Sequence, residues 1–131
     1  MHKITQILTK ARAQKWPDPK TFQALKGLGV ESYVVSLFEG YEAIYQGSFG
    51  VWIDTVSVDY PSQGFDIDEV FYPFGVQVAI MKHTQKKTNY LEFLEDIAAS
   101  GVASYAVDMQ AATVTYFNID RAESYQEIVP I

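Results

Sequence analysis

Three side chains that can hold or exchange a proton lie in the second half of the chain: His83, Tyr105 and Asp108. A histidine titrates near neutral pH, and a phenol and a carboxylate beside it would complete a set for acid–base catalysis. The alternative for His83 is a core-edge ring with one nitrogen bonded to backbone or water. The alternative for Asp108 is an exposed carboxylate, because strand alternation places it on the face opposite Tyr105. We favour these structural interpretations and leave open whether the chain is an enzyme.

Four tyrosines form two matched pairs along the chain. Tyr33 and Tyr105 are as far apart in sequence as Gly29 and Gly101, and we call this spacing the repeat offset. Tyr45 and Tyr116 are closer by a single position. Buried phenol hydroxyls need hydrogen-bond partners, so Tyr33, Tyr45 and Tyr116 are candidates to line a ligand cleft between two halves of the protein. Packing in the core, with the hydroxyls at its rim, is the interpretation that we favour.

Stronger catalytic and metal-binding patterns are missing from the sequence. The chain has no cysteine and only 2 histidines, so we expect no metal site and no other cofactor. It has neither a phosphate-binding glycine loop of the Walker type nor a serine elbow. The partial glycine pattern at Gly27 follows a predicted helix, whereas a dinucleotide-binding fingerprint follows a strand. A helix cap explains that pattern better.

The charge distribution argues against nucleic acid as a partner. The formal net charge is −6, and the basic residues gather in the first 26 positions, where a solvated helix face accounts for them. No apolar run has the length of a membrane span, and the polar N-terminal segment does not resemble a signal peptide. We therefore expect a cytoplasmic protein that binds neither membrane nor nucleic acid.

An internal repeat describes the elements that must position the candidate residues. "GVESYVVSLF" begins at Gly29 and "GVASYAVDMQ" begins at Gly101, so the two stretches are separated by the repeat offset. A helical apolar stripe repeats at the same offset, with Ile4, Ile7, Leu8 and Ala11 matched by Val76, Ala79, Ile80 and His83. Each half therefore reads as two helices followed by three strands, and both glycines suit a left-handed position just after a helix.

The expected fold class is α+β, an internal duplication with six mostly antiparallel strands and helices packed on one face. We expect a single domain over 1–131, with pseudo-repeats at about 1–60 and 73–131 and a linker at 61–72. The backbones of residues 3–46 and 75–117 should superpose, the first hairpin being one residue longer. Asp66 and Glu69 have capping-box spacing, which predicts a short helix running to Pro73. A phase change between Ile53 and Val56 indicates a bulge or bend.

The stretch "HTQKKTNYLEFLEDIAASGVASYAVDMQAATVTYFN", with "TFQALKGLGVESYVV" in the first half, resembles the YbcV-like family of bacterial and prophage proteins. The resemblance covers nearly the whole chain, and some members carry the label "phage envelope protein". It implies a single domain of bacterial or prophage origin and brings no known substrate, cofactor or catalytic residue. Its most specific positions are His83–Gln85, Tyr90 with Phe93, Gly101–Val102, Tyr105 with Asp108, and Thr115–Tyr116.

A homodimeric interaction module is the first functional hypothesis. If the helices cover the sheet face that bears Tyr33 and Tyr105, the other face is too apolar to stay in water. The linker, a ligand or a second subunit would cover it, and we predict a second subunit because twofold homodimers are the commonest oligomers. The alternative is a small-molecule binder or small enzyme that uses His83 and Tyr105. The predicted interface consists of Val34, Phe38, Ile44 and Phe117.

Overall fold

The computed structural model of the chain describes residues 3–14, 18–38, 40–54, 64–85 and 87–128. Each half of the chain runs helix, helix, strand, strand, strand, as the sequence predicts. The first half holds α1 (Lys3–Ala13), α2 (Asp18–Gly27), β1 (Val30–Ser36), β2 (Glu42–Gly47) and β3 (Gly50–Asp54). The second holds α3 (Pro73–Thr84), α4 (Tyr90–Ala99), β4 (Ser104–Asp108), β5 (Thr113–Phe117) and β6 (Ser124–Ile128).

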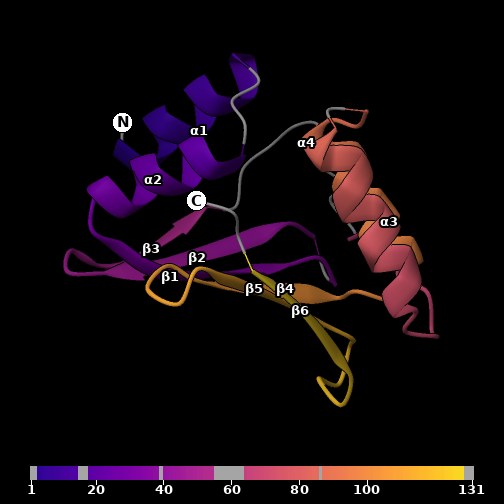
Figure 1. Ribbon diagram of the computed structural model, residues 1–131. Coiled ribbons are helices and arrows are strands. Elements are labelled where there is room, and N and C mark those ends of the chain that lie inside the picture. The colour runs from indigo at the N-terminus through magenta and orange to yellow at the C-terminus, as the bar shows by residue number, and fades with distance from the viewer. Residues whose placement is uncertain (1–2, 15–17, 39, 55–63, 86, 129–131) are drawn as a thin grey trace.

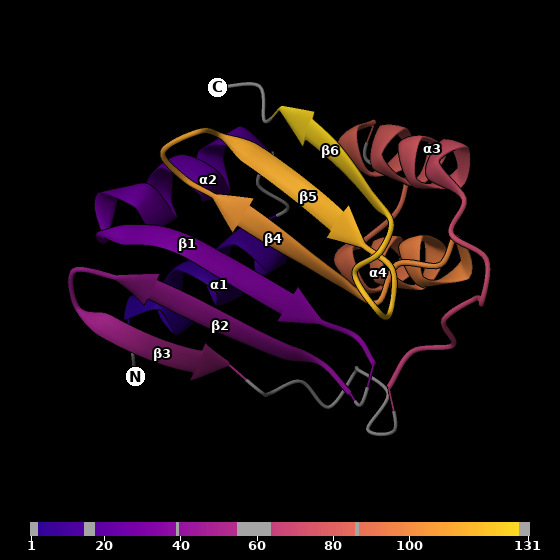
Figure 2. The same ribbon diagram turned by 90° about the horizontal axis from the view of Figure 1, so that it is seen from below.

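The strands form one antiparallel sheet in the order β3-β2-β1-β4-β5-β6 (Figure 2). Among the described strands the sheet is open, with β3 and β6 at its edges. The two three-stranded halves join where β1 pairs with β4, and Val34 faces Ala106 there. Val34 and Ala106 are themselves separated by the repeat offset. The central pairing therefore joins two positions that correspond to each other in the predicted repeat. The duplication itself stays a prediction.

The four helices of the described residues lie on the same side of the sheet, with α1 and α2 over one part of it and α3 and α4 over another (Figure 1). Their apolar stripes face the core as the sequence predicts: Ile4 and Val76 are fully buried. α4 begins with a capping box that the sequence-based predictions did not include. Asn89 accepts a hydrogen bond from the backbone of Glu92, and the Glu92 carboxylate accepts one from the backbone of Asn89.

The turn geometry predicted at Gly29 and Gly101 is confirmed. Their φ angles are 92° and 89°, in the left-handed region where an L side chain is strained. The hairpin prediction is also confirmed, because residues 37–41 connect β1 to β2 and the shorter segment 109–112 connects β4 to β5.

The short helix predicted before Pro73 is wrong. Residues 64–72 contain no helix, because Asp68 accepts a hydrogen bond of 2.8 Å from the backbone of Val70 and closes a tight turn instead. Pro73 is the first residue of α3, where its fixed φ and missing N–H suit the helix start. β3 ends at Asp54, so the bulge predicted between Ile53 and Val56 lies outside the described residues.

Candidate functional site

Two rows of three aromatic side chains lie on the helix-covered face of the sheet, one row in each half. They are offset at the central seam, where Tyr33 pairs with Val107 and Tyr105 pairs with Val35. The pairing register aligns Tyr33 with Tyr45 and Trp52, and aligns Tyr105 with Tyr116 and Tyr125. Neighbouring rings stack or tilt with centroids 4.8 Å apart for Tyr33–Tyr45 and 5.7 Å apart for Tyr105–Tyr116. The candidate binding residues Tyr33, Tyr45 and Tyr116 therefore belong to two offset rows in the layer between the sheet and the helices.

Three phenol hydroxyls form a chain of hydrogen bonds at this layer. The Tyr90 hydroxyl lies 2.6 Å from that of Tyr105 and 3.4 Å from that of Tyr41. The three groups come from α4, from β4 and from the loop before β2. Sequence patterns did not reveal Tyr41 and Tyr90 as partners, because they are separated by 49 positions in the chain. The family resemblance at Tyr90 was the available signal for one of them.

Burial raises the pKa of the Tyr105 hydroxyl well above its ordinary value of 10.0, and the nearby phenols of Tyr33 and Tyr41 add to the shift. The hydrogen bond with Tyr90 acts in the opposite direction. Burial likewise raises the pKa of Tyr90 above 10.0, followed by the influence of Tyr105 and Tyr41. Both hydroxyls consequently keep their protons at neutral pH and act as hydrogen-bond donors and acceptors rather than as bases.

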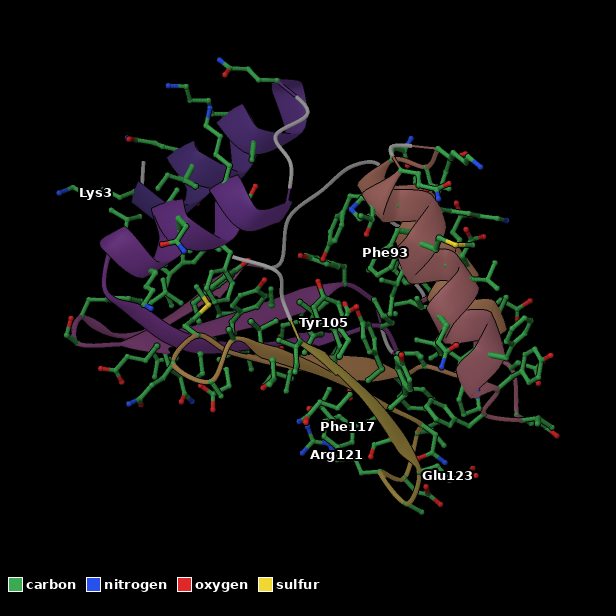
Figure 3. All side chains as sticks on the ribbon, in the orientation of Figure 1. Lys3, Phe93, Tyr105, Phe117, Arg121 and Glu123 are labelled. Carbon is green, nitrogen blue, oxygen red and sulfur yellow. The ribbon has the colours of Figure 1, made fainter. Side chains whose placement is uncertain are left out.

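His83 lies at the edge of the core, partly buried on α3. Its ring stacks on Phe93 with centroids 4.7 Å apart, on the inner side of α4 (Figure 3). Its Nδ1 donates a hydrogen bond to the Thr88 carbonyl at 3.3 Å in the tautomer that protonates Nδ1. Phe93 in turn stacks on Tyr90, with centroids 6.4 Å apart, so two rings separate His83 from Tyr105. The histidine and the hydroxyl chain are linked by contact without forming one catalytic group.

We expect His83→Ala to lower the free energy of unfolding by about 1 kcal/mol, because it removes one stacking contact and one hydrogen bond at a partly buried position. Urea unfolding measures this value. The matched position on α1 is Ala11, so the substituted side chain has a precedent in the same chain. A loss above about 3 kcal/mol would show that the ring is a central packing element.

Asp108 lies apart from His83 and Tyr105. It is exposed on the face that carries no helix, and its Oδ1 accepts hydrogen bonds from the backbones of Gln110 and Ala111 at 2.9 and 3.0 Å. These bonds close the turn after β4, and aspartate side chains commonly stabilise turns in this way. The structure does not bring the three candidate acid–base residues together.

The face opposite the helices carries an apolar centre. None of the described helices lies on it, and its side chains point away from the helices, as Phe117 does in Figure 3. Its central row crosses five adjacent strands with Ile53, Ile44, Val34, Ala106 and Thr115. Of the apolar residues beside that row, Val51 and Ile128 are 63% and 76% exposed. We call this surface the open face.

The four predicted interface residues lie on or next to the open face. Val34, Ile44 and Phe117 are partly buried by their neighbours, and Phe38 is exposed in the turn after β1. The guanidinium of Arg121 lies 4.4 Å from the ring centre of Phe117 and covers part of that ring. Charges are sparse here, since Glu42 and Asp108 occupy only the rows beside the apolar centre.

Across residues 3–14, 18–38, 40–54, 64–85 and 87–128, no group of three or more histidine, aspartate or glutamate side chains is arranged to hold a metal ion. The helices within these ranges are too short or too polar to cross a lipid bilayer.

The family model described as "Protein of unknown function (DUF1398)" matches residues 7–128. The chain belongs to this family. The DUF1398 match runs from α1 to β6, so it includes the hydroxyl chain and the open face. It agrees with the expected family of unknown function, while the narrower YbcV-like and phage labels stay expectations. A search of curated proteins found no match to the chain.

Proposed function

We propose that this chain is an interaction module that forms a twofold homodimer through the open face of its sheet. The observation that carries the proposal is the row of Ile53, Ile44, Val34 and Ala106 on a sheet face that none of the described helices covers, bordered by polar side chains. Interface cores are depleted in charge and surrounded by a polar rim, and aromatic residues and arginine are enriched there. The Phe117–Arg121 pair at the border fits this composition.

The size of the open face supports a dimer contact. Six strands spaced about 4.8 Å apart, each with at least five residues at about 3.3 Å, make a surface of roughly 29 Å by 17 Å. Side chains make the accessible surface larger than this backbone outline. The open face is therefore of the same order as the roughly 800 Å² that each partner buries in a stable interface. A twofold contact needs only one self-complementary surface, and we propose the open face for that role.

Ile53→Glu tests the dimer. Ile53 is 50% exposed on the edge strand β3, so a charge there reaches the interface while leaving the core intact. Each substitution occurs twice in a twofold dimer, and we expect dimerisation to weaken about 100-fold, from about tenfold at each site. Sedimentation velocity at micromolar concentration measures the effect, with Phe38→Glu and Phe117→Glu as companion variants.

Thr9→Glu on the exposed face of α1 is the charge-matched control, and we expect it to sediment like the unmodified protein. Far-UV circular dichroism confirms that each variant keeps its fold. A monomeric unmodified protein, or an unchanged dimer in all three open-face variants, would contradict the proposal.

A second candidate function is a small-molecule site at the hydroxyl chain, which would include His83 as well as Tyr105. The chain of phenols favours it, because protonated hydroxyls can donate hydrogen bonds to an acceptor group on a ligand. Phenol is a suitable probe, and its binding would shift the NMR signals of the Tyr41 and Tyr90 rings. Unchanged ring signals at millimolar phenol would count against this site and leave the dimer as the sole proposal.

A further inference from the structure

α3 carries an apolar stripe on its outward side. Phe74, Val78 and Met81 follow one another at i, i+4 and i+7, so they share one face of the helix. Val70 and Tyr72 continue the stripe before the helix begins, and the Tyr72 ring meets the Phe74 ring at a centroid distance of 5.9 Å. Four of these five side chains, all except Val78, are between 51% and 68% exposed. We call these five residues the α3 stripe.

The fold does not require the α3 stripe. At the repeat offset, Val78 and Met81 correspond to Gln6 and Thr9 of α1, and these two polar residues are exposed. A solvated helix face is ordinarily polar in this way. α1 and α3 therefore use the same inner pattern for the core and differ on the outer side, which indicates that the outer side of α3 meets another surface.

The charges at the two ends of the α3 stripe are opposite. Asp68 and Glu69 precede it, and Lys82 follows Met81 at its other end. Within the part of the chain that the structure describes, neither Glu69 nor Lys82 forms an ion pair. We propose that a second copy of this chain packs its own α3 antiparallel against the α3 stripe, so that each Lys82 meets the acidic end of the other copy.

The antiparallel arrangement matches the shape and the polarity of the helix. Phe74 of one copy packs against Met81 of the other, which places the twofold axis between Gln77 and Val78. The helix dipoles then oppose one another, with each positive end beside a negative end. α3 and the open face lie on different sides of the molecule, so both contacts can form together (Figure 1). Two separate twofold contacts produce an assembly larger than a dimer.

Gln77→Cys tests the position of the axis in a chain that has no other cysteine. Gln77 is exposed, so the new thiol leaves the core unchanged. We expect a short bis-maleimide to link the two thiols of an α3 pair and to give a covalent dimer on a denaturing gel. Thr9→Cys, at an exposed position of α1, is the control and should stay a single chain. Absence of the linked product, or an equal yield from both variants, would overturn the proposal.

Charge exchange tests the orientation. We expect Lys82→Glu to weaken the α3 contact about tenfold and the double variant Lys82→Glu with Glu69→Lys to restore it. These variants are compared by sedimentation in the Ile53→Glu background, in which the open-face contact is weakened. If the open-face dimer does not exist, Ile53→Glu alone has no effect on sedimentation, and the two proposals are tested separately. Sedimentation of the double variant like the single variant would overturn the antiparallel arrangement. If the protein is a monomer that binds neutral lipid vesicles through Phe74, the proposal of a second copy is overturned and the partner of the α3 stripe is a membrane surface.

Discussion

Gly101→Ala is expected to destabilise the protein by about 3–5 kcal/mol, among the largest effects of a single substitution. The backbone at Gly101 has a φ of 89°, which costs an L residue about 1–2 kcal/mol. A Cβ there would lie 2.4 Å from the carbonyl oxygen of Val70 and 2.7 Å from the Cα of Phe71. Both contacts are with backbone atoms, so relief requires the segment before α3 to move.

Gly27→Ala is the matched control for this substitution. Gly27 ends α2, and a Cβ there has no neighbour within 4 Å, so alanine should be neutral or stabilise by about 0.5–1 kcal/mol. Urea unfolding of the two variants measures the difference. Equal stability of the two alanine variants would contradict the close packing of Gly101 on residues 70 and 71. The α3 stripe should also shift in Gly101→Ala, because the backbone of Tyr72 bonds to the Ser100 carbonyl at 2.8 Å.

The second large effect is expected at high pH. The folded protein raises the pKa of Tyr90 and Tyr105 above 10.0 chiefly by burial, whereas the unfolded chain titrates near the ordinary value. Their stabilising contribution is therefore complete below pH 10 and is lost as the pH rises toward their folded pKa values. Each group lowers the free energy of unfolding by about 1.4 kcal/mol per pH unit in that range, so the pair removes about 2.8 kcal/mol per unit.

Urea unfolding from about pH 9 to about pH 11 measures this slope, with tyrosinate absorbance as the direct signal of ionisation. We expect Tyr105→Phe to remove about half of the slope attributed to the pair. Tyr72→Phe removes an exposed phenol outside the hydroxyl chain and serves as the control. Identical slopes for both phenylalanine variants would show that the hydroxyl chain is not the source of the alkaline sensitivity.

Local pattern was sufficient to predict most of the elements. The helical stripes, the strands with alternating apolar residues and the left-handed glycines are each specified by residues close together in sequence. The turn at Asp68 shows where this fails. The spacing of Asp66 and Glu69 predicts a helix start, whereas Asp68, which lies between them, accepts a hydrogen bond from the backbone of Val70 and forms a tight turn. The choice between them depends on Pro73 starting α3, which is a property of the following segment.

The contacts of the candidate site depend on the order of the strands and on helix placement. Tyr41, Tyr90 and Tyr105 meet because β1 and β4 are neighbours and α4 returns over them. The sequence alone does not predict which strands become neighbours. Val34 and Ala106, which pair in the structure, are corresponding positions at the repeat offset. The opposite faces of Tyr105 and Asp108 followed from strand alternation alone and are confirmed.

The pairing of β1 with β4 also has a consequence under the duplication hypothesis. Two identical half-length chains that met along this seam would obey mass action and separate on dilution. Covalent fusion replaces that dependence with an effective concentration in the millimolar range, so the seam persists in any dilute sample. In the fused chain a mutation changes only one half, so the outer surfaces of the two halves can change independently. Under this hypothesis, fusion gives a route by which the outer sides of the two helices came to differ, with glutamine and threonine on α1 and valine and methionine on α3.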